Sequence, residues 1–211
     1  MWRLISGPSW FFGFGALMEF IAFVIAIAIA NQALKGYKLS KEKTLLYLNL
    51  SFVLIGAGLL VDGLSSLIVF LAGARRGFLY PFAIGYTINF LAQAIAYGLI
   101  IYAYIHQARS VDASPAVLAA VPLLFFERNA FTELILIFLL VYIATQTGIN
   151  YSINKSTNSM LVFGAFLSLS IAHVFFLIFA LAPIFYPIAH IAQLCGFLLL
   201  LAMLLRVNRP T

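Results

Sequence analysis

Residues 16–41 read ALMEFIAFVIAIAIANQALKGYKLSK, an apolar run with one glutamate near its start and a basic turn at its end. The run exceeds the roughly 20 helical residues that cross the hydrocarbon core of a bilayer. Residues 130–155, AFTELILIFLLVYIATQTGINYSINK, repeat the pattern without a gap. The two stretches together predict a helical membrane protein built from a duplicated unit.

The composition of the whole chain agrees with a membrane location. Of its 211 residues 64% are hydrophobic and only 9% are charged, with a mean hydropathy of +1.10. A soluble domain carries about 25% charged residues, so the chain has too little polar surface to cover a globule in water. In lipid, backbone groups must be satisfied within the spanning element, which favours helices. We therefore predict an all-α, multi-pass membrane protein whose main partner is the lipid bilayer.

The basic residues and the single cysteine exclude several other classes. The net charge is +6, but the lysines and arginines lie in short segments between apolar runs, which is typical of topogenic signals and not of nucleic-acid binding. Cys195 is the only cysteine, so no internal disulfide or thiolate cluster can form. The first apolar run lacks a small-residue cleavage site, and we expect it to be a retained helix.

Seven apolar segments are predicted, arranged as three, one and three. The first unit is residues 1–109, the linker residues 110–128 and the second unit residues 129–211. The linker helix, about 115–127, contains Pro122 and is short for a bilayer at 1.5 Å per residue. The other six predicted spans are about 10–34, 44–72, 80–106, 130–148, 159–182 and 185–205.

The distribution of positive charge predicts the orientation in a cell membrane. If the linker helix crosses the bilayer, eight basic residues lie on one side and four on the other; if it is re-entrant, the split is six to six. The cytoplasmic side carries the excess of lysine and arginine, so we favour crossing, with the N-terminus outside and the C-terminus in the cytoplasm. The predicted cytoplasmic set is Lys35, Lys38, Lys41, Lys43, Arg109, Lys155, Arg206 and Arg209.

The duplication is indicated by rare residues that recur at fixed shifts. A shift of 114 pairs helices one and two with helices five and six, and a shift of 100 pairs helix three with helix seven. Matches of alanine and isoleucine carry little weight in apolar helices. The informative pairs are Glu19/Glu133, Gln32/Gln146, Tyr37/Tyr151, Lys41/Lys155, Phe52/Phe166, Tyr86/Tyr186 and Gln93/Gln193. With an odd linker helix, the two units would run parallel, as in some transporters.

This layout resembles two known seven-helix families without carrying their motifs. It is similar in plan to the SWEET and semiSWEET sugar transporters, but their Pro-Gln signature is missing from the first and fifth spans. It is also similar in plan to microbial rhodopsins, whose retinal needs a lysine in the last helix, and the last span has none. The chain looks most like uncharacterised small seven-helix membrane proteins of archaea, which implies no assigned chemistry.

Polar residues inside the predicted spans mark a candidate site. An ionisable group at the centre of a membrane helix costs about 2.5–3.5 kcal/mol on insertion scales, so the presence of each such residue needs an explanation. The predicted topology places them all towards the outer side, and helical spacing puts their polar neighbours on the same faces. The predicted ligand-binding residues are Glu19, Asp62, Tyr86, Asn89, Gln93, Glu133, His173, Tyr186, His190 and Gln193.

Four interpretations of this polar cluster remain open. The residues could simply bind the helices together, as in a structural subunit of a membrane complex or a homo-oligomer. They could line an outward-facing pocket for a small ligand, in a transporter or sensory domain, which is the function we favour. They could hold a redox centre, with haem b between His173 and His190 or a metal that also uses Glu133. They could form an intramembrane hydrolase, but motifs such as His-Glu-x-x-His are missing, so we expect no enzyme, no catalytic residue and no cofactor.

Overall fold

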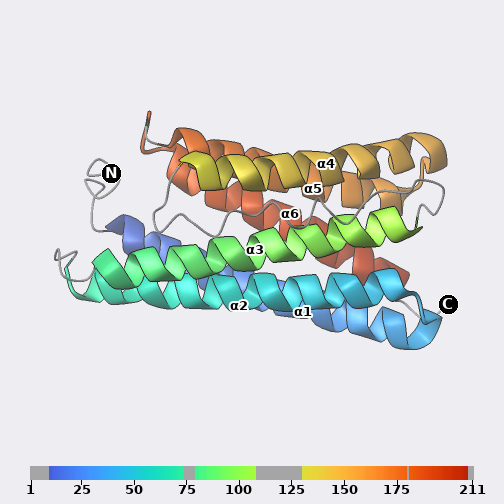
Figure 1. Ribbon diagram of the computed structural model, residues 1–211, viewed down its shortest axis with the longest axis horizontal. Coiled ribbons are helices and arrows are strands. Elements are labelled where there is room, and N and C mark those ends of the chain that lie inside the picture. Colours follow the sequence, from blue (N-terminus) through green and yellow to red (C-terminus); the bar gives the residue numbers. More distant parts are fainter. Residues whose placement is uncertain (1–9, 74–78, 108–129, 180, 209–211) are drawn as a thin grey trace.

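Six long helices form one elongated bundle in the computed structural model (Figure 1). The structure describes residues 10–73, 79–107, 130–179 and 181–208. The described helices are α1 (Trp10–Ser40), α2 (Lys43–Leu71), α3 (Leu79–Gln107), α4 (Ala130–Asn154), α5 (Thr157–Ile178) and α6 (Phe185–Val207). All six are long and apolar enough to cross a membrane. The all-helical character predicted from composition is therefore confirmed for the described residues, and the six apolar helices are compatible with a multi-pass membrane protein.

The predicted count of seven spans is not supported, because the described part of the chain contains six. The linker helix expected at about 115–127 lies outside the described residues. The six observed helices correspond one to one with the other six predicted spans.

The boundary of the first helix differs most from the prediction. We expected a loop over residues 35–43, but α1 continues through Ser40, and only two residues separate it from α2. Polar residues here do not end the helix, because Gly36 is buried against the bundle and the backbone continues to bond within the helix. α4 likewise runs past the predicted Gly148 to Asn154. α5 ends at Ile178, earlier than the predicted 182.

α1 and α4 end in the same unusual backbone geometry. Lys41 and Lys155 are the only non-glycine residues with positive φ among those described, at 60° and 47°. The amide of each bonds to the carbonyl of a tyrosine four residues earlier, Tyr37 and Tyr151, at 2.8 Å in both cases. A left-handed residue with a side chain costs roughly 1–2 kcal/mol and is usually glycine at a helix end. The two exceptions lie 114 residues apart, which is the shift that pairs the two stretches in the sequence.

The helix contacts form a closed ring. Each helix packs on its neighbour in the sequence within α1–α2–α3 and within α4–α5–α6, and the ring closes through α1 on α6 and α3 on α4. α3 and α4 run in the same direction, as Figure 1 shows. In agreement with this, Tyr86 near the start of α3 contacts Glu133 near the start of α4. Exchanging the two units turns the α1–α6 contact into the α4–α3 contact. The ring therefore has the connectivity of two parallel three-helix units.

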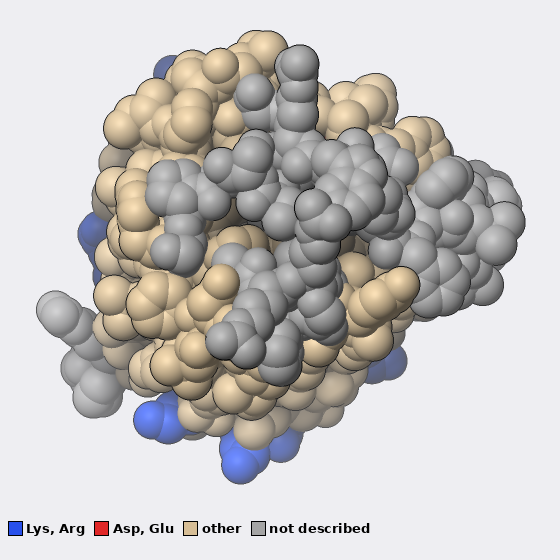
Figure 2. All heavy atoms as spheres, turned by 90° about the vertical axis from the view of Figure 1, so that its left-hand side faces the viewer, with Lys and Arg blue, Asp and Glu red and all other residues tan. Residues whose placement is uncertain are grey.

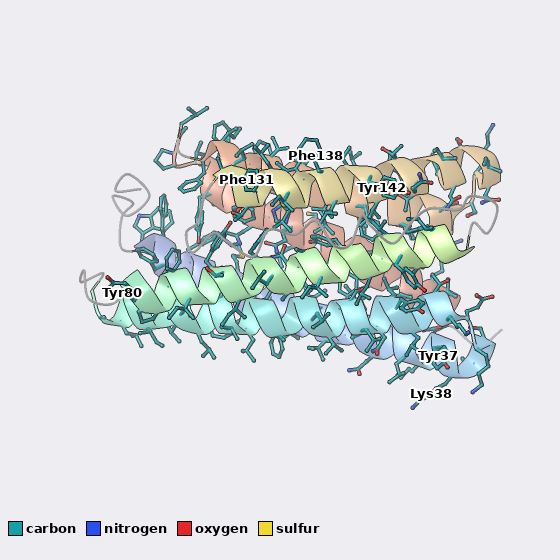
Figure 3. All side chains as sticks on the ribbon, in the orientation of Figure 1. Tyr37, Lys38, Tyr80, Phe131, Phe138 and Tyr142 are labelled. Atoms are coloured by element: carbon teal, nitrogen blue, oxygen red, sulfur yellow. The ribbon has the colours of Figure 1, made fainter. Side chains whose placement is uncertain are left out.

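Small, aliphatic and aromatic residues fill the interior, and further large apolar side chains cover the outside. Ala26, Ala30 and Ala33 on one face of α1 are buried, which lets the helices approach closely. In Figure 3 Phe138 of α4 points away from the bundle, and its side chain is 73% exposed. An outer surface of this kind suits contact with lipid and would be a liability in water.

The described positive charges gather at one end of the bundle. All six described lysines and arginines lie at or near the ends where α1, α4 and α6 finish and α2 begins: Lys35, Lys38, Lys41, Lys43, Lys155 and Arg206. Figure 2 looks at the bundle from the opposite end, and there the blue side chains show only at the outline. We call the charged end the basic end and keep this name below.

Candidate functional site

One small cavity brings together nine of the ten residues predicted to form the site. Its volume is about 30 Å³, and its lining comes from all six helices. The predicted residues that line it are Glu19, Asp62, Tyr86, Asn89, Gln93, Glu133, His173, His190 and Gln193. All nine are buried, and no lysine or arginine is among the described lining residues. The cavity lies in the half of the bundle away from the basic end, the half predicted to be outer.

Tyr186 is the predicted residue that does not line the cavity. It is buried in an aromatic cluster next to the cavity, with its ring centroid 5.3 Å from that of Phe11 and 4.7 Å from that of His190. Its hydroxyl reaches the backbone of α1 at Gly15, where a Cβ atom would lie 2.2 Å away. The helical spacing that linked Tyr186 to His190 and Gln193 was therefore right about the face of α6, but the tyrosine points towards α1.

Glu133 and His173 form the most directly connected part of the site. Nδ1 of His173 lies 2.8 Å from Oε2 of Glu133, and an ionised carboxylate can only accept, so the imidazole donates. The other oxygen of Glu133 accepts from the Tyr86 hydroxyl at 3.0 Å. Because Nδ1 is engaged, Nε2 of His173 is left without a hydrogen-bond partner among the described residues, although it is buried. This nitrogen belongs to a side chain that lines the cavity.

Asp62 lies at the end of a chain of hydrogen bonds along α3. Tyr97 donates to Gln93 at 3.4 Å, Gln93 donates to Asn89 at 3.0 Å, and Asn89 donates to Oδ2 of Asp62 at 3.0 Å. The three α3 residues follow at i, i+4 and i+8 and so lie on one face. The chain orients both amides and directs a donor at the carboxylate. We call these four side chains the amide chain.

Gly58 of α2 allows the amide chain to form. A Cβ atom at this position would lie 2.9 Å from both the Cβ of Ala92 and the Oδ1 of Asn89. Such distances are shorter than side chains tolerate, so α2 and α3 can approach this closely only with glycine at position 58. The position thus links helix packing to the placement of Asn89.

We expect Gly58→Ala to lower the free energy of unfolding in detergent by about 1–3 kcal/mol, the usual cost of overpacking. Gly164→Ala on α5 is the matched control, because its Cβ would meet only Leu199 at an ordinary 3.6 Å. That control should be neutral or slightly stabilising, since alanine is the better helix former. Equal stability of the two variants would contradict the close approach described above.

The two units contribute different chemistry to the cavity. The glutamates, tyrosines and glutamines occur in both units. Glu19 packs on Gly63, because a Cβ atom added to this glycine would lie 3.3 Å from the Cβ of Glu19. The remaining groups are not shared: Asp62 corresponds to Phe176, and His173 and His190 correspond to Leu59 and Phe90. These three apolar counterparts also line the cavity. The first unit therefore supplies an extra acid and the second supplies both bases.

Among the described residues, the geometry provides no haem-sized space between the two histidines and no assembled set of metal ligands. The ring of Phe176 contacts both imidazoles, with centroids 5.9 Å from that of His173 and 5.0 Å from that of His190. Organic ligands occupy pockets of about 300–1,000 Å³, ten or more times the volume available here. Among the described residues no three His, Cys, Asp or Glu side chains are placed to hold a metal ion.

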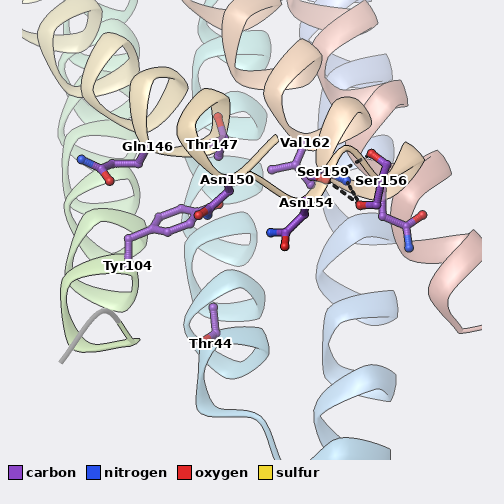
Figure 4. Close-up of a pocket in the computed structure, with 10 residues that line it drawn as sticks. Thr44, Tyr104, Gln146, Thr147, Asn150, Asn154, Ser156, Ser159 and Val162 are labelled. Carbon is purple, nitrogen blue, oxygen red and sulfur yellow. Dashed lines mark hydrogen bonds between the residues drawn. The ribbon is translucent and has the colours of Figure 1, made fainter. Parts of the chain in front are cut away.

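A second hollow, which the sequence analysis did not predict, lies at the basic end (Figure 4). Its volume is about 570 Å³, and it opens between the ends of α2, α3, α4 and α5. We call it the vestibule; its lining residues are Thr44, Tyr104, Gln146, Thr147, Asn150, Asn154, Ser156, Asn158, Ser159 and Val162. A sequence signal existed, because Gln146, Asn150, Asn154 and Asn158 follow one another at intervals of four.

The comparisons with known proteins add no family to these observations. No known family matches the sequence, and neither the curated proteins nor the solved structures contain a significant match.

Proposed function

We propose that the protein is a membrane transporter whose buried cavity binds and releases a proton. The observation that carries the proposal is the meeting of three carboxyl groups and two imidazoles, from five helices, around about 30 Å³. The lining residues concerned are Glu19, Asp62, Glu133, His173 and His190.

Charge balance supports a proton as the bound species. Each uncompensated ion buried away from water costs several kcal/mol. If all three carboxyl groups were ionised and both imidazoles protonated, one negative charge would remain, and with neutral imidazoles three would remain. The described lining has no lysine or arginine to compensate. With the described residues alone, a bound proton or a monovalent cation would balance the remaining charge.

The sequence analysis favoured a small organic ligand, but the cavity is too small to hold one as it stands. A water molecule needs about 10–15 Å³ of such space, so the cavity has room for one or two water-sized species. A larger solute would require the helices to move. Since every helix contributes to the lining, any relative movement of the two units would change the surroundings of the carboxyl groups. This is the property that couples proton binding to a conformational change.

Infrared spectroscopy of the purified protein tests proton binding. We expect a protonated-carboxyl band that changes with pH while the protein stays folded, and that loses intensity in Glu133→Gln. Glu42→Gln is the control, because Glu42 is exposed at the turn between α1 and α2 and its carboxyl group is solvated. The proposal fails if the folded wild type shows no such band, or if only Glu42→Gln alters it.

The same measurement separates transport from a purely structural role. Residues that only bind the helices together need not change protonation. A structural subunit would therefore show carboxyl bands that do not respond to pH or to the Glu133→Gln substitution.

A further inference from the structure

The vestibule lies beside α4, and the corresponding place beside α1 in the other unit is occupied differently. The shift of 114 relates Gln146 and Asn150 of α4 to Gln32 and Gly36 of α1. Gln146 and Asn150 line the vestibule, and Asn150 is exposed. Gly36, by contrast, is buried. The place that is hollow beside α4 is therefore filled beside α1.

Asn208 fills the place beside α1. Its Nδ2 donates to the backbone carbonyl of Gln32 at 2.8 Å and to the side-chain oxygen of the same residue at 3.3 Å. A Cβ atom on Gly36 would lie 3.2 Å from Oδ1 of Asn208, so the glycine leaves room for the carboxamide. One neutral amide thus occupies the first unit's version of the vestibule.

Among the described residues, no side-chain amide bonds to Gln146 as Asn208 bonds to Gln32. The shift of 100 relates Asn208 to Ala108, whose side chain has no polar group and which lies outside the described residues. Gln146 has the same acceptor groups as Gln32, which binds Asn208, but Gln146 lines the open vestibule. The vestibule contains a further acceptor, because Oδ1 of Asn158 is buried and has no hydrogen-bond partner among the described residues.

We propose that the vestibule binds a small neutral molecule bearing a primary amide, held by Gln146 as Asn208 is held by Gln32. Every polar group in the described lining is a hydroxyl or a carboxamide, so an uncharged ligand that both donates and accepts hydrogen bonds fits its chemistry. The volume of about 570 Å³ lies within the usual range for organic ligands. Tyr104 and Val162 supply apolar surface for a ring or short chain.

Nicotinamide and nicotinate form a matched pair of probes, because they share a ring and differ in the amide against an ionised carboxylate. We expect the purified wild type to bind nicotinamide saturably in a calorimetric titration and to bind nicotinate at least about tenfold more weakly, since no cation is among the described lining residues to receive its charge. Absence of saturable nicotinamide binding, or equal binding of both probes, would overturn the proposal.

Two glutamine variants test whether the amide site belongs to the second unit alone. Gln146→Leu should weaken nicotinamide binding about tenfold or more, as expected for a lost hydrogen bond in a polar pocket. Gln32→Leu changes the corresponding glutamine, which Asn208 already occupies, and should leave binding unchanged. Asn150→Ala, at an exposed position, is a second vestibule variant should Gln146→Leu fail to fold, and it too should weaken binding. Equal effects at positions 32 and 146 would contradict the assignment.

The vestibule is separate from the cavity, and its test needs no proton movement. Failure of nicotinamide to bind would leave the infrared prediction for Glu133 standing. Failure of the infrared prediction would leave the amide site standing.

Discussion

Glu133→Ala is expected to lower the free energy of unfolding by about 3–5 kcal/mol, the range seen when one partner of a buried pair is removed. The substitution leaves Nδ1 of His173 buried without its acceptor and removes one of the partners of the Tyr86 hydroxyl, which keeps Thr132. Typical hydrogen bonds between membrane helices contribute only about 0.6 kcal/mol, so a large loss would show that the whole group acts as a unit. Thermal and chemical unfolding in one detergent measures the difference.

Glu133→Gln is the control for this experiment. Glutamine has the same shape and keeps an oxygen that can accept from one of the two donors, so it should recover much of the lost stability. A stability for Glu133→Ala within about 1 kcal/mol of the wild type would show that the pair is an ordinary membrane contact.

Phe52→Ala is expected to cost about 2–3 kcal/mol through lost packing at the centre of the bundle. Phe52 is fully buried, and its ring meets that of Phe197 on α6 edge-to-face with centroids 5.8 Å apart. In soluble proteins such a truncation costs about 3–5 kcal/mol, of which part is transfer from water. That part is small here because the unfolded helix keeps the side chain in lipid, so mainly the cavity cost remains.

Phe138→Ala provides the matched comparison. Phe138 is an equally large side chain on α4, but it is 73% exposed on the outer surface. Its loss should change the unfolding free energy by less than about 0.5 kcal/mol. If the two alanine variants were equally stable, the packing between α2 and α6 would not be as described.

The sequence was sufficient for the helices and for the cluster of polar residues, because both depend on periodicity. Glu19 and Glu133 are rare charges in apolar helices, and helical spacing placed Asn89 and Gln93 on one face, which the structure brings to the cavity. Burial of these groups is costly enough in a membrane that few arrangements can accommodate them. Their ligand and their transport role stay predictions.

Helix ends and cavity volume could not be predicted, because they depend on contacts between distant residues. α1 runs on to Ser40 since Gly36 packs against Leu45 and Asn208, which are not its neighbours in sequence. The direction in which Tyr186 points is set by the missing side chain of Gly15 on another helix. The vestibule likewise could not be predicted, because the contact that fills the corresponding place beside α1 joins Asn208 to Gln32, 176 residues apart.

The amide chain has a consequence for how protons can travel through the protein. A hydroxyl or an imidazole can take up a proton on one side and give one up on the other, but the NH₂ group of a carboxamide does not readily release its protons. Asn89 and Gln93 stand between Asp62 and Tyr97, with their donors all directed towards the carboxylate. Asn89 and Gln93 therefore interrupt a relay of protons between Tyr97 and Asp62, while the hydrogen bond from Asn89 holds the carboxylate in place.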